Sequence, residues 1–316
     1  MKVKRMFYSL NFFIEKGHRI LFRGIALFLL LVCNCNKKPQ QNNQKQWNSD
    51  LHLAASQGNE SRIRNLIEGG ADVNQKDNAG QAPLHWAARE GNLDCIQYLM
   101  EKGANVNQLD NEETNPLQVA ISMSIAISTP SEARKNLACI KSLISQGTNL
   151  NQLSKNGYAP LHLAVCQNNY ADCVTILINN KADVNQKTKD GKTPLQLAIE
   201  RNQPNYIPIL IKGGANVNQL NDGSTLLHLA AEQYRADCIP ALIKGGVDVN
   251  QKSDFLGLTP LHRAVLQKDV DCIIALINEG AKVNLPNKHG DTPLQLAIER
   301  EYSNCIDILK KHGGRV

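Results

Sequence analysis

Apolar residues recur with helical spacing along most of the chain. In residues 95–100 and again in residues 272–277, apolar side chains occupy positions i, i+1, i+4 and i+5, which share one face of an α-helix. A shorter stretch rich in Leu and Ala precedes each of these segments, as in residues 226–231. The pattern therefore predicts pairs of helices, the first short and the second longer.

Residues that favour helix ends and tight turns separate the predicted helices. A threonine or serine before a proline is typical of a helix start, because the proline at the first helical position needs no amide hydrogen. This predicts helices beginning at Thr193, Thr259 and Thr292. Glycine can adopt the left-handed conformation that ends a helix. The glycines expected to end second helices are Gly69-Gly70, Gly103, Gly213-Gly214, Gly245-Gly246 and Gly280. Pairs typical of hairpin tips are Asn156-Gly157, Asp190-Gly191 and Asp222-Gly223.

The helix-start signals recur with a period near 33 residues. Pro83, Pro116, Pro160, Pro194, Leu226, Pro260 and Pro293 follow one another at spacings of 33, 44, 34, 32, 34 and 33. A second marker has nearly the same period: Asn74, Asn107, Asn151, Asn185, Asn218, Asn250 and Asn284. One such unit is too small to bury a core, so stability is expected to come from stacking neighbouring units.

The repeated residues resemble those of the ankyrin repeat. The resemblance is carried by Thr259-Pro260-Leu261-His262, by Leu227-His228-Leu229-Ala230-Ala231 and by Gly103-Ala104-Asn105-Val106-Asn107. It implies an all-α solenoid of helix-turn-helix units linked by β-hairpin loops. We expect eight repeats, starting near residues 47, 78, 111, 154, 188, 220, 253 and 286. The first lacks the Thr-Pro start and the last lacks the Asn exit, as capping repeats do.

The N-terminal segment differs from the repeats. Basic residues up to Arg23 precede the apolar run of residues 25–32, which is too short to span a bilayer and is typical of a signal peptide. Cysteines follow it, so the segment resembles a bacterial lipoprotein signal, which implies a signal peptide over residues 1–34 and lipid on Cys35, with Cys33 as the alternative. A short uncleaved anchor is the other interpretation. Polar residues 35–46 are then a flexible tether, and residues 47–316 the repeat domain.

The excess positive charge, like the apolar run, lies at the N-terminus. Residues 1–38 hold eight Lys and Arg and a single Glu, whereas the rest of the chain holds 27 basic and 28 acidic residues. The net charge of +6 therefore belongs to the N-terminus. A repeat domain of almost balanced charge gives no reason to expect nucleic-acid binding.

Repeat 3 is longer than the other repeats. The additional residues fall in 122–136, where Thr129-Pro130-Ser131-Glu132 has the composition of a capping box. The sequence thus predicts a second helix extended at its start and displayed at the edge of the solenoid. A functional extension and a tolerated loop insertion are both compatible with this pattern.

Cysteines and histidines recur at fixed positions of the repeats. Six cysteines share one position, with Tyr206 in its place in repeat 5: Cys95, Cys139, Cys173, Cys238, Cys272 and Cys305. One repeat separates them, which is too far for a disulfide or a shared ion, so we expect buried thiols. Cys166, placed where a first helix faces outward, is expected to be the most reactive thiol.

Five histidines share a position in the first helix: His52, His85, His162, His228 and His262. Gln118, Gln196 and Gln295 occupy it in three other repeats, which suits a hydrogen-bonding role better than a metal ligand. In ankyrin repeats this histidine is structural. The sequence contains no phosphate-binding glycine loop, nucleophile elbow or HExxH motif, and we expect neither an enzyme nor a cofactor.

Ankyrin repeats bind proteins through hairpin tips and the outward side of the first helices, which line a concave face. Transferred to this chain, the residues expected on that face are Trp86, Arg89, Glu90, Tyr158, Gln167, Lys192, Glu200, Arg201, Glu232, Gln233, Phe255, Leu256, Gln267, Asp291, Glu299 and Arg300. Trp86 is either a binding hot spot or a packing residue between repeats 2 and 3. Phe255-Leu256 lengthens one tip with apolar residues and is a candidate contact point.

The sequence therefore predicts a monomeric interaction scaffold, lipid-anchored in a bacterial cell envelope on its periplasmic or exterior side, that binds another protein on its concave face. The alternative is a structural or metal-buffering envelope protein without a specific protein partner.

Overall fold

The computed structural model describes residues 50–123, 129–218 and 224–316 of the 316-residue chain. The described residues all belong to one compact unit, Ser49–Val316. The predicted signal peptide with Cys33 and Cys35, the tether, and the Asp222-Gly223 tip lie outside the described residues.

The described residues form sixteen α-helices, one short 3-10 helix and no β-strand, arranged as eight consecutive helix pairs. The pairs of repeats 1 to 4 are α3 (Asp50–Ser56) with α4 (Glu60–Glu68), α5 (Pro83–Glu90) with α6 (Leu93–Glu101), α7 (Pro116–Ser122) with α8 (Pro130–Ser145), and α9 (Pro160–Val165) with α10 (Ala171–Asn179). The pairs of repeats 5 to 8 are α11 (Pro194–Glu200) with α12 (Tyr206–Lys212), α13 (Leu226–Glu232) with η3 (Ala236–Cys238) and α14 (Ile239–Lys244), α15 (Pro260–Leu266) with α16 (Val270–Asn278), and α17 (Pro293–Glu299) with α18 (Ser303–Lys311).

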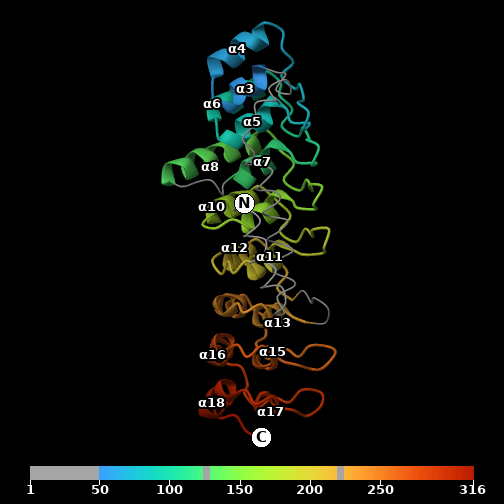
Figure 1. Ribbon diagram of the computed structural model, residues 1–316, viewed down its shortest axis with the longest axis vertical. Helices are drawn as coiled ribbons and strands as arrows, with labels where there is room; N and C mark the ends of the chain where they lie inside the picture. The colour runs from blue at the N-terminus through green and yellow to red at the C-terminus, as the bar shows by residue number, and fades with distance from the viewer. Residues whose placement is uncertain (1–49, 124–128, 219–223) are drawn as a thin grey trace, which may run out of the picture. The chain divides into compact units, whose positions relative to one another are not determined.

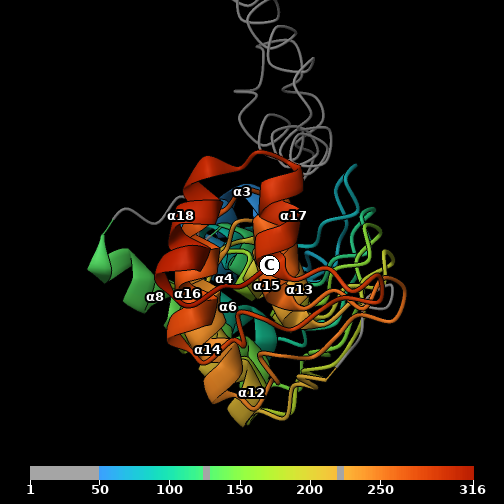
Figure 2. The same ribbon diagram turned by 90° about the horizontal axis from the view of Figure 1, so that it is seen from below.

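Each helix packs on its equivalent in the next repeat. First helices contact first helices, as α5 contacts α7, and second helices contact second helices, as α6 contacts α8, so the unit has two layers of helices (Figure 1). Seen from the end, the first helices α13, α15 and α17 lie between the second helices and the row of connecting loops (Figure 2). The expected all-α repeat architecture is confirmed, with hairpin-like turns in place of regular β-hairpins in the described loops.

The predicted helix ends are also confirmed. The hydroxyls of Thr193, Thr259 and Thr292 accept a hydrogen bond from the backbone N–H three residues on, at the start of α11, α15 and α17. Left-handed glycines follow the second helices of repeats 1, 2, 5, 6 and 7: Gly70, Gly103, Gly214, Gly246 and Gly280. Repeat 4 departs from this rule, because Lys181 takes the left-handed position with φ of 72°.

The longer second helix of repeat 3 begins where the capping residues predict. Thr129 accepts from the backbone N–H of Glu132, and the Glu132 carboxylate accepts from the backbone N–H of Thr129 at 3.0 Å. Helix α8 has 16 residues, compared with nine in α6 and α10, and it projects beyond them (Figures 1 and 2). Most residues of its first turn are exposed.

Candidate protein-binding face

The histidine register links each first helix to the next repeat. In His85, His162, His228 and His262, Nδ1 accepts from the N-cap backbone N–H three residues earlier, at 3.0–3.2 Å. Nε2 therefore carries the proton and donates to a backbone carbonyl of the following repeat. The carbonyls are those of Thr114, Gln186, Leu258 and Asp291, at 2.7–3.2 Å. Both ring nitrogens are occupied, which supports the structural role.

Gln118 makes both of the equivalent contacts, and Gln196 and Gln295 make the one at the N-cap. Gln118 Oε1 accepts from the backbone N–H of Asn115 at 2.9 Å, and Gln118 Nε2 donates to the carbonyls of Gln152 and Tyr158. Gln196 and Gln295 accept from the backbone N–H of Thr193 and Thr292 at 2.8 and 2.7 Å. An amide has an acceptor and a donor at its two ends, as a neutral imidazole has, which explains the exchange.

Burial keeps these histidines uncharged. Desolvation lowers the pKa of His85, His162 and His262, and it lowers the pKa of His228 to about 4. The hydrogen bond from each Nε2 to a carbonyl opposes this shift without cancelling it. In His85 and His162 a protonated ring would also place a second N–H against the N-cap backbone N–H, because the N-cap residues Ala82 and Ala159 have no side-chain oxygen that could accept it.

The six cysteines of the shared position are buried, as expected. Burial raises the pKa of Cys95 and Cys139 to about 11 and that of Cys238 to about 12. These thiols are small core residues and not nucleophiles. Within the described residues no group of three His, Cys, Asp or Glu side chains could hold a metal ion.

Cys166 is less buried than the six other cysteines of the described residues, and its rank as the most reactive thiol stays a prediction. Its side chain is half-buried, and desolvation raises its pKa, although the neighbouring Arg201 acts in the opposite direction. A thiol with a raised pKa carries less thiolate at neutral pH and is a weaker nucleophile. Cys166 is thus more accessible than the other described cysteines, while its raised pKa limits the thiolate fraction.

A buried polar network joins repeats 3, 4 and 5, and the sequence pattern did not indicate it. Asn136 in α8 donates to the carbonyl of Ala120 at 3.0 Å and accepts from the hydroxyl of Tyr170. The hydroxyl of Tyr206 donates to the carbonyl of Gln167 at 2.6 Å and accepts from the backbone N–H of Tyr170 at 2.7 Å. The network fastens the extended helix of repeat 3 to its neighbours.

We call the outward sides of the first helices, together with the loop tips beside them, the candidate face. Seven of the sixteen predicted residues are exposed there: Glu90, Arg201, Glu232, Phe255, Leu256, Glu299 and Arg300. Eight are half-buried: Trp86, Arg89, Tyr158, Lys192, Glu200, Gln233, Gln267 and Asp291. Gln167 is a correction, because its side chain is 7% exposed and cannot contact a partner without rearrangement.

Each described tip is closed by its own hydrogen bonds. A backbone bond of 2.9 Å joins the N–H of Asp77 to the carbonyl of Gln81, and equivalent bonds close residues 110–114, 154–158, 188–192 and 287–291. In repeat 7 the bond runs from Ser253 to Leu258, one residue wider, and within this wider tip the side chain of Phe255 is 84% exposed. The apolar lengthening predicted for this tip is therefore present.

Backbone bonds also join one tip to the next. The N–H of Asn111 donates to the carbonyl of Ala79, that of Lys155 to Glu112, and that of Lys288 to Leu256, at 3.0, 2.7 and 3.0 Å. Below the tips, Asn74 accepts from the backbone N–H of Asn105, and Asn107 accepts from that of Asn149, at 2.7 Å each. The recurring asparagines thus hold successive repeats in a fixed relation.

Trp86 is held within repeat 2. Its Nε1–H donates to Asp77 at 3.0 Å, and the guanidinium of Arg89 lies 4.7 Å from the centre of its ring. Arg89 also donates to Gln81 at 3.1 Å, and Gln81 donates to Asp110 in the next tip. The contacts of the indole with Asp77 and Arg89, both within repeat 2, favour a packing role for its half-buried ring.

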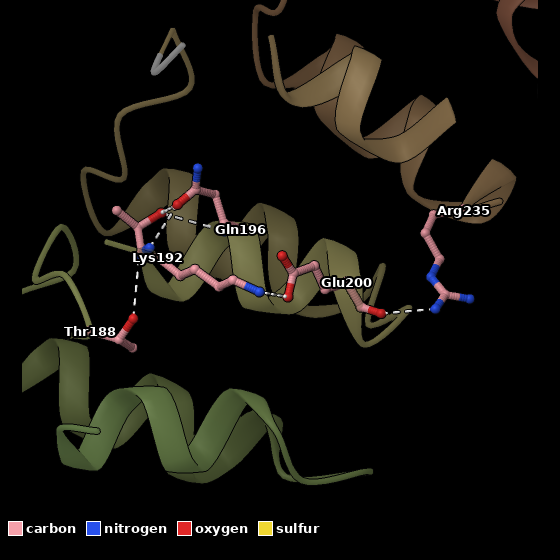
Figure 3. A network of polar contacts seen from close by, with 6 residues as sticks. Thr188, Lys192, Gln196, Glu200 and Arg235 are labelled. Carbon is pink, nitrogen blue, oxygen red and sulfur yellow. Dashed lines mark hydrogen bonds and ion pairs between the residues drawn. The ribbon is translucent and has the colours of Figure 1, made fainter. Parts of the chain in front are cut away.

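Charged side chains of repeats 5 and 6 form a second fixed group (Figure 3). Lys192 Nζ lies 2.7 Å from Glu200 Oε2, so an ion pair spans from the tip to the end of α11. Arg235, which sequence analysis did not single out, donates to the carbonyl of Glu200 at 2.9 Å. Arg235 precedes η3, at a position that holds Asn in repeats 1 to 3 and Tyr in repeats 4 and 8, so periodicity gave no reason to expect an arginine contact there.

A family model described as ankyrin repeats, three copies, matches residues 21–110, 51–129, 123–221 and 227–316. The chain belongs to the ankyrin repeat family. Ankyrin repeats are generally protein–protein interaction modules of a non-enzymatic type, and they suggest a protein partner for this chain. No curated protein matches the chain. Within the described residues, no helix is both long and apolar enough to cross a bilayer.

Proposed function

We propose that this ankyrin repeat chain is a monomeric scaffold that binds another protein on the candidate face. The observation that carries the proposal is the combination of fixed backbone and varied side chains on that face. Hydrogen bonds close each tip and join tips to one another, so little conformational entropy is lost on binding. The exposed side chains of the tips differ from repeat to repeat, whereas the first helices of repeats 5 and 8 end alike in Glu200-Arg201 and Glu299-Arg300. The tips therefore supply the variation that recognition of one partner requires.

A photocrosslinking experiment tests this proposal. In the full chain, a photoreactive residue replaces Glu90, Arg201 or Glu232 on the candidate face and, as controls, Asp94, Lys141 or Asp271 on exposed positions of second helices. We expect the first set to give a discrete adduct with one protein and the second set to give none. Adducts that form equally from both layers, or from neither, contradict the proposal.

We further propose that lipid on Cys35 holds the scaffold at a bacterial cell envelope. The support lies in the sequence: a basic segment, a short apolar run over residues 25–32, two cysteines and a polar tether. Several acyl chains would anchor the chain firmly, whereas one would bind marginally. The ankyrin family match begins at residue 21, so it overlaps the region assigned to the signal peptide.

Intact mass and membrane fractionation test the anchor, with Cys33→Ala and Cys35→Ala variants compared. The expected result is a shortened, acylated chain in the membrane fraction that is lost in Cys35→Ala and kept in Cys33→Ala. The reverse assigns the lipid to Cys33. An unmodified chain that retains Met1 rejects the lipid anchor.

A further inference from the structure

The tips of neighbouring repeats carry opposite charge. The tip of repeat 3 (residues 110–114), here called the acidic tip, holds Asp110, Glu112 and Glu113. The tips of repeats 4 and 5 (residues 154–158 and 187–192), here called the basic tips, hold four lysines and one aspartate: Lys155, Lys187, Lys189, Lys192 and Asp190. This reversal is specific to these repeats, because residues 252–258 and 287–291 in repeats 7 and 8 together hold two lysines and two aspartates.

Most of this positive charge has no ion-pair partner among the described residues. Lys155, Lys187 and Lys189 are exposed, and none of them takes part in an ion pair with the described residues. Lys189 donates to the uncharged carbonyl of Lys155. Of the four lysines, Lys192 is the one paired with a described residue, Glu200 (Figure 3). The ammonium groups are therefore available to an incoming anion.

The basic tips form one continuous surface. The bond from Lys189 Nζ to Lys155 fastens the two tips together, and a Cβ at Gly157 would lie 2.6 Å from the backbone nitrogen of Lys189. The half-buried ring of Tyr158 lies in the same tip as Lys155 and packs edge-on to His162. Positive charge beside a fixed aromatic ring is a favourable setting for a polypeptide that carries acidic and apolar side chains.

Resting on the function proposed above, we infer that the partner presents an acidic, extended segment to the basic tips of repeats 4 and 5. Stacked repeats are separated by about 10 Å, and an extended chain advances about 3.3 Å per residue. Acidic residues at every third position of the segment therefore meet successive tips.

The neighbouring acidic tip favours a polypeptide over a membrane or a nucleic acid. The backbone N–H of Lys155 donates to the backbone carbonyl of Glu112. The acidic tip and the first basic tip are therefore in direct contact. A uniformly anionic bilayer or phosphate chain that covered the basic tips would also meet Glu112 and Glu113 and be repelled. A polypeptide can change its own charge at this boundary.

Fluorescence anisotropy on the full chain tests the inference. The probe is a fluorescein-labelled peptide with Glu at every third position and Tyr or Ser between, and the same peptide with Lys for Glu is the control ligand. The test variant is Lys187→Glu with Lys189→Glu. Its matched control is Lys252→Glu with Lys288→Glu, where Lys288 donates to the carbonyl of Asp254 as Lys189 does to that of Lys155.

We expect saturable binding of the Glu peptide, weakened about tenfold in the test variant, changed less than about twofold in the matched control, and reduced by added salt. Absence of saturable binding, or equal weakening in both variants, overturns the inference. So does tighter binding of anionic phosphatidylglycerol vesicles or single-stranded DNA that depends on the same lysines. If crosslinking from the candidate face still captures a partner in that case, the proposed function stands without this inference.

Discussion

The buried starts of the first helices and the exposed tips beside them follow different rules. At the helix start the same two-ended hydrogen bond recurs in repeat after repeat, through His85, His162, His228 and His262 or through a glutamine. At the tips the backbone is equally regular, but the charge reverses between Glu112 and Lys155. Positions that must satisfy buried backbone groups are fixed by the fold, whereas positions in water are left to recognition.

The largest expected effect on the free energy of unfolding comes from removing the histidine hydrogen bonds at the start of one first helix. His228→Ala leaves the backbone N–H of Thr225 and the carbonyl of Leu258 without partners in a buried place, and we expect a loss of about 3 kcal/mol in the free energy of unfolding. His228→Gln is the control, because glutamine fills this position in three other repeats. Urea unfolding followed by circular dichroism measures both. Equal losses in the two variants would show that volume and not hydrogen bonding decides this position.

Lowering the pH should also reduce the free energy of unfolding of the unmutated chain through the buried histidines. The pKa of His228 is about 4 in the folded chain and about 6.5 when unfolded, so between these values the unfolded chain binds more protons and stability falls as pH falls. Neighbouring Arg263 and His262 act in the same direction. At pH 4.5 we expect this residue alone to cost about 2.5 kcal/mol. In His228→Gln the dependence of unfolding free energy on pH should be shallower from pH 6.5 to 4; an unchanged slope contradicts the assignment.

The polar network of repeats 3 to 5 tests whether a residue that is not repeated, Tyr206, can contribute as much stability as a repeated histidine. Tyr206→Phe removes the hydroxyl that donates to the carbonyl of Gln167 and accepts from the backbone N–H of Tyr170. We expect a loss of about 2 kcal/mol in the free energy of unfolding. Tyr98→Phe is a suitable control, since Tyr98 is buried too and no hydrogen bond of its hydroxyl is found within the described residues. Denaturant unfolding compares the two, and a loss of the same size in Tyr98→Phe would assign the effect to packing.

Sequence reasoning succeeded where a residue repeats and failed where the repeat is interrupted. Helix starts at Thr193, Thr259 and Thr292 follow from local chemistry, and so do the left-handed glycines. Gln167 was misplaced because α9 has six residues, one fewer than α11. Its turn places the left-handed residue at Asn169, so the register shifts by one and Gln167 turns inward.

Interruption of the repeat also hid the contacts that join repeats. Asn136 lies in the extended segment of repeat 3, and Tyr170 follows the lengthened turn of repeat 4. Both lie three residues before the shared cysteine, a position where the residue type changes from repeat to repeat, so no common partner could be inferred. Their pairing depends on tertiary contact across 34 residues, which no local pattern contains. The charge reversal at the tips was visible in the sequence, but it becomes meaningful once the tips are known to touch.

A smaller effect is expected at the exit of repeat 4, where Lys181 stands in the left-handed conformation at which most repeats have glycine. Lys181 is exposed, and Lys181→Gly should raise the free energy of unfolding by about 1 kcal/mol through relief of backbone strain. Gly103→Lys is the mirror experiment. A Cβ at Gly103 would meet no atom within 4 Å. The stability lost in Gly103→Lys should therefore come from backbone strain alone and be similar in size to the stability gained in Lys181→Gly.

The smallest effect on stability is expected where the effect on binding is largest. Lys187 and Lys189 are exposed and lie outside any ion pair of the described residues, so Lys187→Glu with Lys189→Glu should change the free energy of unfolding by less than about 0.5 kcal/mol. Urea unfolding of this variant beside Lys252→Glu with Lys288→Glu provides the measurement. If the urea midpoints of both double variants are unchanged, any difference in their peptide binding is due to the charge of the tips and not to a loss of folding. A midpoint lowered in the first variant alone would instead assign these lysines to the fold, and the separation of buried, repeated positions from exposed, variable ones would not hold in repeat 5.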